Sequence, residues 1–286
     1  MNTQSKAVLV TGCSTGIGHE TARHLARAGF TVYATARKSD TLEDLKAEGC
    51  KTLALDVTDE DSMAAAVKSV EEAEGAIWGL VNNAGYSQSG AVETIPIESI
   101  RKQFETNVFG LVRMCQLVLP AMRARGEGRI VNIGSMGGKL TFPGGGTYHA
   151  TKYAVEAFSD ALRFEASGFG IKVVLIEPGF IKTHFADTAR RSLDSVAETA
   201  PAFGAYANFN EAVATATGEA YEGPVSKLGG GPETVAAVIE KALTARRPRP
   251  RYTVTPSAKL LIMQRKFTPD RLWDLAMRTQ FPRPGR

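Results

Sequence analysis

A phenol and an ammonium group are spaced for chemistry in the stretch "TYHATKYA". Tyr148 and Lys152 are four residues apart in a run that has no Gly or Pro from Thr147 to Phe158, so helical periodicity places both side chains on one face. A free phenol has a pKa near ~10 and is a poor base at neutral pH, but a neighbouring positive charge stabilises the phenolate. Such a pair can exchange a proton with an alcohol or a carbonyl. Taken alone, the spacing is also what a solvated helix face shows by chance.

Two further polar residues extend this pair. The stretch "IGSMGG" places Ser135 at the end of a predicted strand, and ligands of open α/β sheets bind beyond the carboxyl ends of the strands. The Ser135 hydroxyl can therefore orient the oxygen with which Tyr148 exchanges its proton. Asn107, in "FETNVFG", falls inside a predicted helix, although Asn is a mediocre helix former. Both a buried functional Asn and an ordinary exposed polar residue are compatible with that position.

A glycine-rich segment, "TGCSTGIG" at 11–18, follows the first predicted strand and opens the first predicted helix. Its glycines permit a tight turn, close approach of the backbone to a pyrophosphate, and close packing of helix and strand. The helix N-terminus adds free N–H groups and the positive end of a dipole. The spacing is G-x-x-x-G-x-G, and a purely structural turn is the alternative. The predicted cofactor contacts here are Gly12, Ser14, Thr15, Gly16, Ile17 and Gly18.

The end of the second predicted strand indicates which dinucleotide would bind. An NAD site commonly has an acidic residue there, which binds the ribose 2′-hydroxyl. In "ATARKSD", Ala36 stands at that place and is followed by Arg37 and Lys38. An Arg can bind a 2′-phosphate bidentately, whereas a carboxylate repels it. The sequence therefore predicts NADP as cofactor. The alternative is an ordinary solvated basic turn without a ligand, and the nearby Asp40 is the residue that leaves this alternative possible.

The next two strand ends supply further predicted contacts with the cofactor. In "LDVTD", Asp56 suits a contact with the adenine amino group, and Val57 suits an apolar wall for adenine. The stretch "NNAG" ends the fourth predicted strand, and its small residues suit close packing of backbone against a ribose. The predicted contacts in that stretch are Asn83, Ala84 and Gly85.

The elements that must position these residues follow an alternating pattern. Short apolar runs, nearly continuous in Val, Ile and Leu, are typical of parallel strands covered on both faces. Strands that alternate with helices predict right-handed crossovers and an α/β, doubly wound, mostly parallel sheet of Rossmann type. The predicted strands span 6–11, 31–36, 51–55, 76–83, 128–135 and 171–178, and the predicted helices span 16–28, 59–74, 96–124, 147–167 and 232–245.

We expect residues 1–286 to form a single Rossmann-type domain, because no repeat or linker divides the chain. Two segments interrupt the alternation. Residues 180–231 form a long insertion rich in Ala and small polar residues, of the kind that usually makes a lid or a substrate loop. Residues 256–286 form a C-terminal extension that contains one or two amphipathic helices. From Arg246 onward the chain carries a net charge of +9, and the preceding residues carry −5.

Composition excludes several kinds of site. The three cysteines, Cys13, Cys50 and Cys115, have no CxxC spacing, which argues for a reducing compartment and against a disulfide frame or a zinc site. The four histidines have no ligand pattern and suggest surface or supporting roles. No run approaches ~18 apolar residues, and no signal peptide is evident, so we expect a cytoplasmic protein without a metal. The basic tail is a local feature and does not indicate nucleic-acid binding.

These motifs occur together and in order, and from Lys6 to about Thr183 the sequence resembles the short-chain dehydrogenase/reductase family. The resemblance implies a tetrad in which Tyr148 is the acid and base, and Ser135 positions the substrate. It implies that Lys152 lowers the pKa of the tyrosine and binds the nicotinamide ribose, and that Asn107 holds a water in a proton relay. In "EPGFIKT" the implied cofactor contacts are Pro178 and Gly179, with Ile181 and Thr183 facing the nicotinamide carboxamide.

Within that family the chain is most similar to the 17β-hydroxysteroid and retinol dehydrogenase branch, on "TGCSTGIG", "VYATARK" and "RPRYTVTPSAKLL". The resemblance implies an NADP(H)-dependent oxidoreductase that interconverts an alcohol and a carbonyl on a lipophilic substrate. It also implies a homodimer or homotetramer, joined through helices 96–124 and 147–167. The alternatives are a reductase of small or acyl-derived ketones, and a nucleotide-sensing or scaffold protein without turnover.

We further expect the apolar side of residues 257–280 to close over the substrate cleft, near a lid formed by 184–230. The segment has many large apolar residues, including Met and Trp, which suit a pocket for a bulky apolar molecule. A helix that merely packs on the sheet or on a partner subunit is one alternative. Peripheral contact of a basic amphipathic helix with an anionic membrane is the other.

Overall fold

The centre of the molecule is a seven-stranded sheet in the order β3-β2-β1-β4-β5-β6-β7, in which every neighbouring pair is parallel. The structure is a computed structural model that describes residues 5–183, 188–189, 191–193, 203–222 and 227–285. The strand order reverses between β1 and β4, which creates the crevice where such sheets bind ligands. The strands are β1 (Ala7–Val10), β2 (Thr31–Ala36), β3 (Lys51–Ala54), β4 (Gly79–Asn82), β5 (Gly128–Ile133), β6 (Ile171–Glu177) and β7 (Arg251–Thr253).

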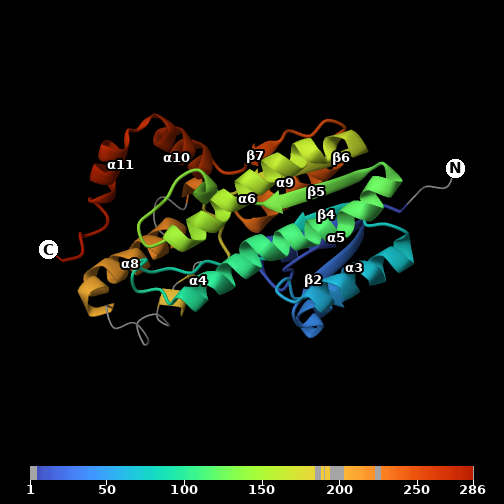
Figure 1. Cartoon of the computed structure of the whole chain (residues 1–286), viewed down its shortest axis with the longest axis horizontal. Coiled ribbons are helices and arrows are strands. Elements are labelled where there is room, and N and C mark those ends of the chain that lie inside the picture. Colours follow the sequence, from blue (N-terminus) through green and yellow to red (C-terminus); the bar gives the residue numbers. More distant parts are fainter. Residues whose placement is uncertain (1–4, 184–187, 190, 194–202, 223–226, 286) are drawn as a thin grey trace.

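Helices cover both faces of this sheet (Figure 1). The longer ones are α1 (Gly16–Arg27), α2 (Glu43–Ala47), α3 (Glu60–Glu74), α4 (Ile97–Phe104), α5 (Gly110–Arg125), α6 (Gly146–Glu165), α8 (Ala207–Glu222), α9 (Pro232–Thr244), α10 (Pro256–Phe267) and α11 (Asp270–Met277). Short turns of 3-10 helix are η1 (Ser39–Leu42), η3 (Met136–Gly138), η4 (Ser167–Phe169) and η5 (Phe203–Tyr206), and η2 (Glu105–Phe109) is a π-helical turn.

The two faces of the sheet bury two separate hydrophobic cores. Successive strand residues point to opposite faces, so Val8 belongs to one core and Leu9 to the other. Helices α3, α5 and α6 cover the core of Leu9, and helices α1 and α9 cover the core of Val8. Burial on both faces explains why the strands read as continuous apolar runs and not as an alternating pattern.

The structure confirms the predicted α/β class and the six predicted strands, with shorter bounds. The predicted strand 76–83 begins at Gly79. The seventh strand, β7, was not predicted, because the Pro- and Arg-rich sequence before it lacks an apolar run. The predicted single helix 96–124 consists of α4, η2 and α5, with the π-helical turn in its middle.

The insertion and the C-terminal extension lie at the end of the molecule away from the N-terminus (Figure 1). Within 180–231 the structure describes α8 and helical residues at 188–189 and 191–193, whereas 184–187, 190, 194–202 and 223–226 lie outside the described residues. One or two helices were predicted for the extension, and it folds into two, α10 and α11. Thr268 and Pro269 separate them, because a proline disfavours helical geometry in the residue before it.

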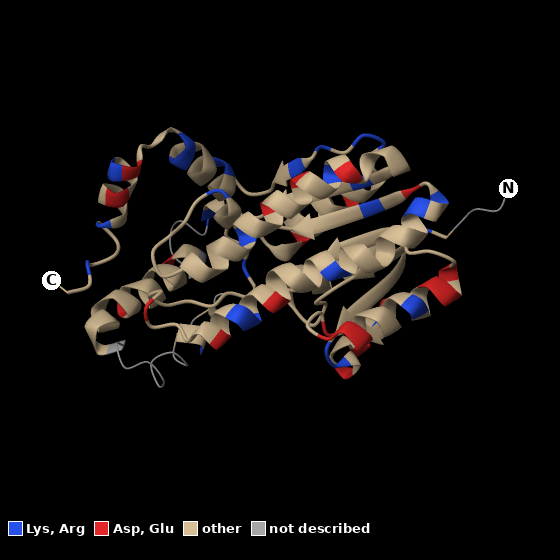
Figure 2. Ribbon diagram, in the orientation of Figure 1, with Lys and Arg blue, Asp and Glu red and all other residues tan. Residues whose placement is uncertain are grey.

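Basic side chains follow the loop between α9 and β7 and continue on α10 and α11 (Figure 2). The charge asymmetry predicted from the sequence is therefore present as a surface feature. Arg251 is an exception, because it turns inward to form ion pairs with Glu156 and Asp160 of α6. Among the described residues, no helix is long and apolar enough to cross a membrane.

Candidate active site

The glycine-rich loop between β1 and α1 has the geometry that its glycines predict. Gly12 has a φ of 72° and Gly16 has a φ of 65°. Residues other than glycine rarely adopt such positive φ angles. A Cβ on Gly12 would lie 2.8 Å from Ala84 Cα, and a Cβ on Gly18 would lie 2.3 Å from the Gly12 carbonyl oxygen. Gly12 and Gly18 are thus required by close contacts of the loop with itself and with the end of β4.

Asn83 and Ala84 fasten this loop to the end of β4. The Asn83 side-chain amide donates to the carbonyl oxygens of Thr11 and Gly12, at 2.9 and 3.0 Å. The backbone N–H groups of Asn83 and Ala84 donate to Thr11 Oγ1, at 3.0 and 3.1 Å. The predicted stretch "NNAG" therefore shapes the loop, and Thr11, which is 1% exposed, is a supporting residue that the sequence reasoning missed.

The N-terminus of α1 is open toward the crevice side of the loop. Thr15 is the N-cap residue of this helix, and its side chain makes no capping hydrogen bond. Ser14 and Thr15 are exposed, and Ile17 is partly buried against the core under α1. A helix N-terminus whose N–H groups are not capped by a side chain is suited to bind an anion such as a phosphate.

The end of β2 presents two exposed basic side chains. Arg37 and Lys38 directly follow the strand, and Asp40 lies in the adjoining turn η1. Within the part of the chain that the structure describes, no carboxylate lies within ion-pair distance of Arg37 or Lys38, Asp40 included. The Arg37 guanidinium is therefore available for an anionic ligand.

The end of β3 carries Asp56 and Val57, which are both held by neighbouring residues. The Asp56 Oδ1 atom accepts hydrogen bonds from the Thr58 backbone N–H and hydroxyl, at 2.9 and 2.8 Å, so this oxygen fixes its own turn. Val57 is 8% exposed and packs against the first residue of α5, because a Cβ on Gly110 would lie 2.9 Å from Val57 Cβ. Both residues have a structural role here, and their predicted contact with adenine stays a prediction.

Asn107 is buried in the π-helical turn η2 and is 1% exposed, so the exposed alternative is wrong. Its Oδ1 accepts from the Tyr86 N–H at 3.0 Å, and its Nδ2 donates to the Tyr86 carbonyl oxygen at 2.9 Å and to Thr151 Oγ1 at 3.1 Å. Asn107 thereby joins the segment after β4 to helix α6. The widened turn explains why a poor helix former stands in a long helix, and such turns are frequent at functional sites.

Ser135 and Tyr148 meet beyond the end of β5. Ser135 caps the turn η3, and its Oγ accepts from the Gly137 N–H at 3.0 Å. The Ser135 hydroxyl is also near the Tyr148 phenol, in the first turns of α6, and lowers the pKa of that phenol. The hydroxyl groups of Ser135 and Tyr148 were predicted to share a substrate oxygen. The fold thus brings them together although the two residues are 13 positions apart in the chain.

Lys152 lies one helical turn after Tyr148, as predicted, and is 6% exposed. Its Nζ donates to the Ile133 carbonyl oxygen at 2.8 Å and lies 5.8 Å from the centre of the Tyr148 ring. Burial lowers the pKa of Lys152 to about 8, because a low dielectric disfavours the charged amine. Tyr148 is half-buried and Lys152 is buried, so the pair does not lie on a solvated helix face.

The pKa of Tyr148 is not lowered in this structure, although the family resemblance implies that Lys152 lowers it. Burial raises the pKa of Tyr148 to about 12, and Ser135 acts in the opposite direction. Removal of the phenolate from water thus outweighs the effect of Ser135. At neutral pH the site holds a neutral phenol, which is the form that can donate a proton.

The stretch from Pro178 to Thr183 lies between the Ser135 turn and the glycine-rich loop. The Pro178 carbonyl accepts from the Met136 N–H at 2.9 Å, and a Cβ on Gly179 would lie 2.2 Å from Thr255 Oγ1. Ile181 is 4% exposed and forms an isolated parallel bridge with Gly230. Thr183 lies next to Gly16, since a Cβ on that glycine would be 3.4 Å from Thr183 Cβ.

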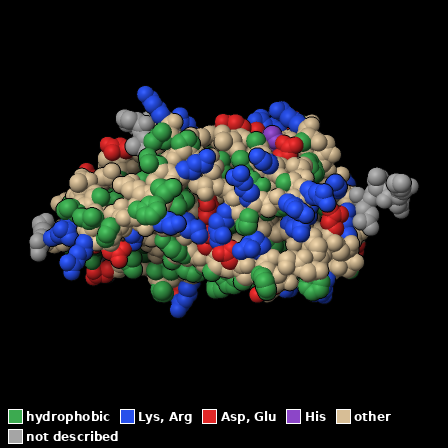
Figure 3. Space-filling view, turned by 90° about the horizontal axis from the view of Figure 1, so that it is seen from above, with side chains coloured by type: hydrophobic (Ala, Val, Ile, Leu, Met, Phe, Trp, Pro, Cys, Tyr) green, Lys and Arg blue, Asp and Glu red, His purple; other side chains and the backbone are tan. Residues whose placement is uncertain are grey.

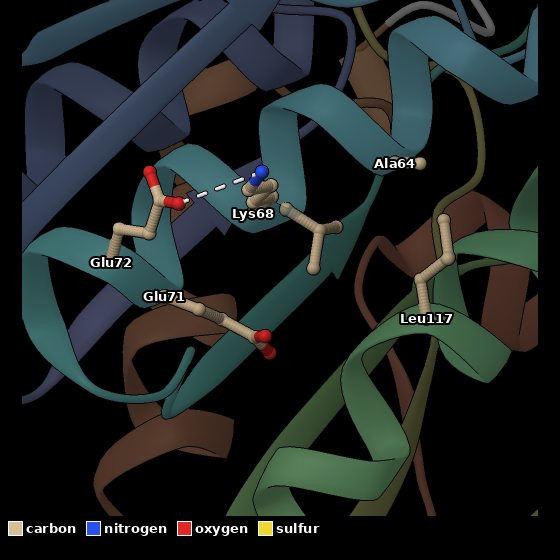
Figure 4. Close-up of a pocket in the computed structure, with 6 residues that line it drawn as sticks. Ala64, Lys68, Glu71, Glu72 and Leu117 are labelled. Carbon is tan, nitrogen blue, oxygen red and sulfur yellow. Dashed lines mark ion pairs between the residues drawn. The ribbon is translucent and has the colours of Figure 1, made fainter.

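A surface hollow lies apart from the group of residues around Ser135, Tyr148 and Lys152. This hollow between α3 and α5 is lined by six residues that include Lys68, Glu72 and Leu117 (Figure 4). Lys68 and Glu72 form an ion pair across 3.7 Å, and none of the predicted site residues lines this hollow. In the described ranges, no three His, Cys, Asp or Glu side chains are grouped so that they could hold a metal ion.

Comparison with known proteins agrees with this geometry. Residues 6–194 match the short chain dehydrogenase family. The uncharacterized oxidoreductase YbbO of Escherichia coli (strain K12) is 36% identical over 270 residues, which cover 94% of this chain and 93% of that protein. The 17-beta-hydroxysteroid dehydrogenase type 6 of Bos taurus is 34% identical over 294 residues, which cover 99% and 90%. A serine dehydrogenase solved in its closed form with NADP+ is similar with a TM-score of 0.74 and 29% identity, over 87% of this chain and 94% of that one.

Proposed function

Since the chain belongs to the short-chain dehydrogenase family and is an oxidoreductase, we propose that it uses NADP(H) to interconvert an alcohol and a carbonyl on a lipophilic substrate the size of a steroid or retinoid. The observation that carries the proposal is the contact of Ser135 with Tyr148 beside the buried Lys152. A nucleotide-sensing or scaffold protein without turnover has no need of that arrangement.

We assign the proton transfer to Tyr148. In the reductive direction its neutral phenol donates a proton to the carbonyl oxygen of the substrate, and in the oxidative direction the phenolate accepts the alcohol proton. Ser135 orients the same oxygen by a hydrogen bond. The Lys152 ammonium stabilises the phenolate when it forms, which offsets part of the cost that burial imposes.

Asn107 completes the tetrad as a relay residue. Both ends of its side-chain amide are used by Tyr86 and Thr151. We therefore assign the water of the predicted proton relay to the main chain of the π-helical turn and not to the amide. In this role the side chain keeps the turn in register with helix α6.

The residues around the crevice fit a dinucleotide. The positive φ angles of Gly12 and Gly16, the uncapped N-terminus of α1 and the exposed Ser14 and Thr15 suit a pyrophosphate. A bound nicotinamide cofactor supplies or accepts the hydride. In the proposal Lys152 also binds the nicotinamide ribose, while Ile181 and Thr183 border the carboxamide, and Pro178 and Gly179 border the ring.

We propose NADP(H) and not NAD(H) because of Arg37 and Lys38. These side chains are exposed at the end of β2, where a 2′-phosphate would lie, and Ala36 leaves no carboxylate there. The serine dehydrogenase that the structure resembles was solved with NADP+, which supports the same choice.

The lipophilic substrate class is supported by the C-terminal extension. Trp273 of α11 is 6% exposed, and its ring lies 6.3 Å from that of Phe142, next to the helix that carries Tyr148. Phe281 packs against Phe209 of α8, with ring centres 6.4 Å apart. The extension and the insertion therefore meet close to the proposed site through aromatic side chains. The bovine relative named a 17-beta-hydroxysteroid dehydrogenase supports the same branch of the family.

We also propose that the protein is a homodimer or homotetramer joined through α5 and α6. Four aromatic side chains on this side are exposed by 44 to 81%: Phe109, Tyr153, Phe158 and Phe164. Large exposed apolar side chains that share a face commonly mark an interface.

For the location we keep the prediction of a reducing, cytoplasmic compartment, supported by three buried cysteines that form no disulfide.

The decisive experiment is a substrate panel measured with both cofactors. The panel contains steroid ketones, retinaldehyde and short ketones, each tested with NADPH and with NADH. We expect turnover with NADPH and the highest kcat/KM for the bulky lipophilic compounds. A preference for short or acyl-derived ketones would replace the proposed substrate class by the alternative reductase.

The variant Tyr148→Phe tests the mechanism on the same panel. Only the hydroxyl is lost, so NADPH affinity measured by fluorescence should be unchanged, while kcat should fall by at least ~10²-fold. Near-normal turnover of Tyr148→Phe would overturn the assignment of the proton transfer.

A further inference from the structure

A buried histidine joins the turn that carries Ser135 to the helix that carries Tyr148. His149 is 7% exposed; its Nδ1 lies 3.0 Å from the Gly137 carbonyl oxygen, and its Nε2 lies 3.3 Å from the Phe142 backbone nitrogen. A carbonyl only accepts and a backbone amide only donates. The ring therefore carries its proton on Nδ1, donates to Gly137 and accepts from Phe142.

Gly137 connects His149 to Ser135 through its two backbone polar groups. Its N–H donates to Ser135 Oγ at 3.0 Å, while its carbonyl accepts from His149. Ser135 in turn lies close enough to the Tyr148 phenol to lower its pKa. Tyr148, Ser135, Gly137 and His149 thus form a closed circuit, in which the last link is the peptide bond between Tyr148 and His149.

The surroundings hold the His149 ring in one orientation. A Cβ on Gly137 would lie 2.5 Å from Nδ1, and a Cβ on Gly145 would lie 2.7 Å from Nε2, so the ring fills the space that both glycines leave. Its edge packs against the Tyr148 ring, with centres 5.7 Å apart and planes at 63°. Such close packing restricts the ring to a single rotamer.

We propose that His149 is a positioning residue, whose bond to Gly137 sets the distance and direction of Ser135 relative to Tyr148. This inference rests on the proposed function, because it assigns Ser135 and Tyr148 to one substrate oxygen. His149 touches neither the substrate nor the cofactor in this role. It acts by keeping the Ser135 hydroxyl beside the phenol, where Ser135 lowers the pKa of Tyr148.

Two isosteric variants separate the two bonds of the ring. In His149→Asn the side-chain amide can take the place of Nδ1 and donate to Gly137, whereas in His149→Gln it reaches the place of Nε2 and can serve only Phe142. The histidine His24, which pairs with Glu240 at 2.7 Å on the far side of the sheet, gives the control variant His24→Gln.

The first measurement is hydrogen exchange at the Gly137 amide, which donates to Ser135 and can be followed by NMR without any substrate. We expect His149→Gln to speed this exchange about fivefold, since a hydrogen bond of this kind contributes ~1 kcal/mol. The variants His149→Asn and His24→Gln should keep the wild-type rate.

The second measurement is the pH dependence of kcat for alcohol oxidation with NADP+. The substrate is whichever of estradiol, retinol and 2-butanol the wild type oxidises fastest. Loss of the Ser135 bond leaves the phenol harder to ionise, so the profile of His149→Gln should move to higher pH, with kcat at pH 7 lowered about tenfold. His149→Asn should keep the wild-type profile, and a general loss of stability would not separate these two variants.

A third variant reaches the same bond from the other side. In Gly137→Ala the new methyl group would displace the His149 ring, so this variant should reproduce the effect of His149→Gln even if the latter does not fold. The proposal is overturned if His149→Gln and Gly137→Ala keep the wild-type exchange and profile, or if His149→Asn is affected as strongly as His149→Gln. Failure of the proposed function is distinguishable, because it would abolish turnover of the wild type and leave the exchange pattern intact.

Discussion

At the residue scale, burial has a larger effect on the proposed site than the neighbouring charge. Burial favours the uncharged form of both the Tyr148 phenol and the Lys152 amine. It raises the pKa of the phenol to about 12 and lowers the pKa of the amine to about 8. Desolvation acts on each group separately, whereas their mutual attraction exists only when both are ionised. The phenol is therefore a proton donor at rest, and ionisation must be favoured by charge that arrives with the ligands.

Arg37 allows a direct test of the cofactor at this scale. We expect Arg37→Asp to shift the ratio of kcat/KM for NADPH over NADH by at least ~10-fold toward NADH, because a carboxylate repels the 2′-phosphate and accepts the 2′-hydroxyl. The matched variant Arg37→Ala should lower the value for NADPH and leave that for NADH unchanged. An unaltered ratio in Arg37→Asp would mean that this side chain points away from the cofactor.

His149 makes a prediction about stability in acid. Burial lowers its pKa to about 4, compared with 6.5 for a free histidine. The unfolded chain therefore binds a proton at a pH where the folded chain does not, so this contribution is complete above pH 6.5 and is lost as the pH falls toward 4. We expect the Tm of His149→Asn to fall less steeply than that of the wild type between pH 6.5 and 4. Equal slopes in thermal unfolding would contradict the buried neutral state.

At the scale of elements, helix α6 organises the site, because one turn of it carries Tyr148, His149, Thr151 and Lys152. The same helix is anchored further along by Glu156, which is 6% exposed and pairs with Lys139 at 2.6 Å and with Arg251 of β7 at 3.0 Å. Burial and the adjacent Glu177 raise the pKa of Glu156. The edge strand β7 thus connects the C-terminal part of the chain to the helix that carries the proposed chemistry.

The two faces of α11 allow the role of the extension to be tested. Trp273 points inward and donates its indole N–H to the Thr141 carbonyl oxygen at 3.4 Å, whereas the adjacent Leu272 is 57% exposed. If the extension covers the substrate, Trp273→Ala should lower kcat/KM for steroid- or retinoid-sized ketones by at least ~10-fold and spare short ketones. Leu272→Ala should leave both values unchanged.

Other outcomes of this pair point to the alternatives. An equal loss for all substrates in Trp273→Ala would indicate that α11 only packs against the fold. Loss of binding to anionic vesicles in Leu272→Ala, with unchanged activity, would indicate contact with a membrane, for which the exposed Leu260, Met263 and Phe267 would supply further apolar surface.

At the scale of the whole molecule, most of the large apolar side chains that are exposed among the described residues fall in two areas. One is on the outer side of α6 and of η2, and the other is on α10 and α11. On the face seen in Figure 3, hydrophobic side chains and Lys and Arg side chains lie side by side. The apolar area on α6 includes the most exposed large apolar side chain of the described residues, Phe164, which makes this area a candidate for contact between copies of the chain.

Phe164 is the most exposed side chain of that area, at 81%. We expect Phe164→Glu to reduce the oligomeric mass in size-exclusion chromatography with light scattering, because two buried carboxylates would face each other across a symmetric interface. The control Phe267→Glu, on the 73% exposed Phe267 of α10, should leave the mass unchanged. A wild-type protein that is monomeric, or a Phe164→Glu variant of unchanged mass, would contradict the predicted interface.

Features that depend on local pattern were predictable from the residues in their chain order. Continuous apolar runs predicted the buried parallel strands, and spacing four apart predicted that Tyr148 and Lys152 share one helical face. The glycines of the loop after β1 were readable for the same reason, since a φ of 72° at Gly12 and 65° at Gly16 excludes most other residues. The short strand β7 and the π-helical turn at Asn107 escaped prediction, because neither has a periodicity of its own.

Features that depend on residues far apart in the chain were settled by the fold alone. The fold brought Ser135 to Tyr148, packed Val57 against Gly110, and gave His149 its place between Gly137 and Phe142. It also reversed the expected direction of the Tyr148 pKa. The physical reason is shared: hydrogen-bond partners and desolvation depend on which atoms surround a group in space, and a sequence pattern specifies only its neighbours along the chain.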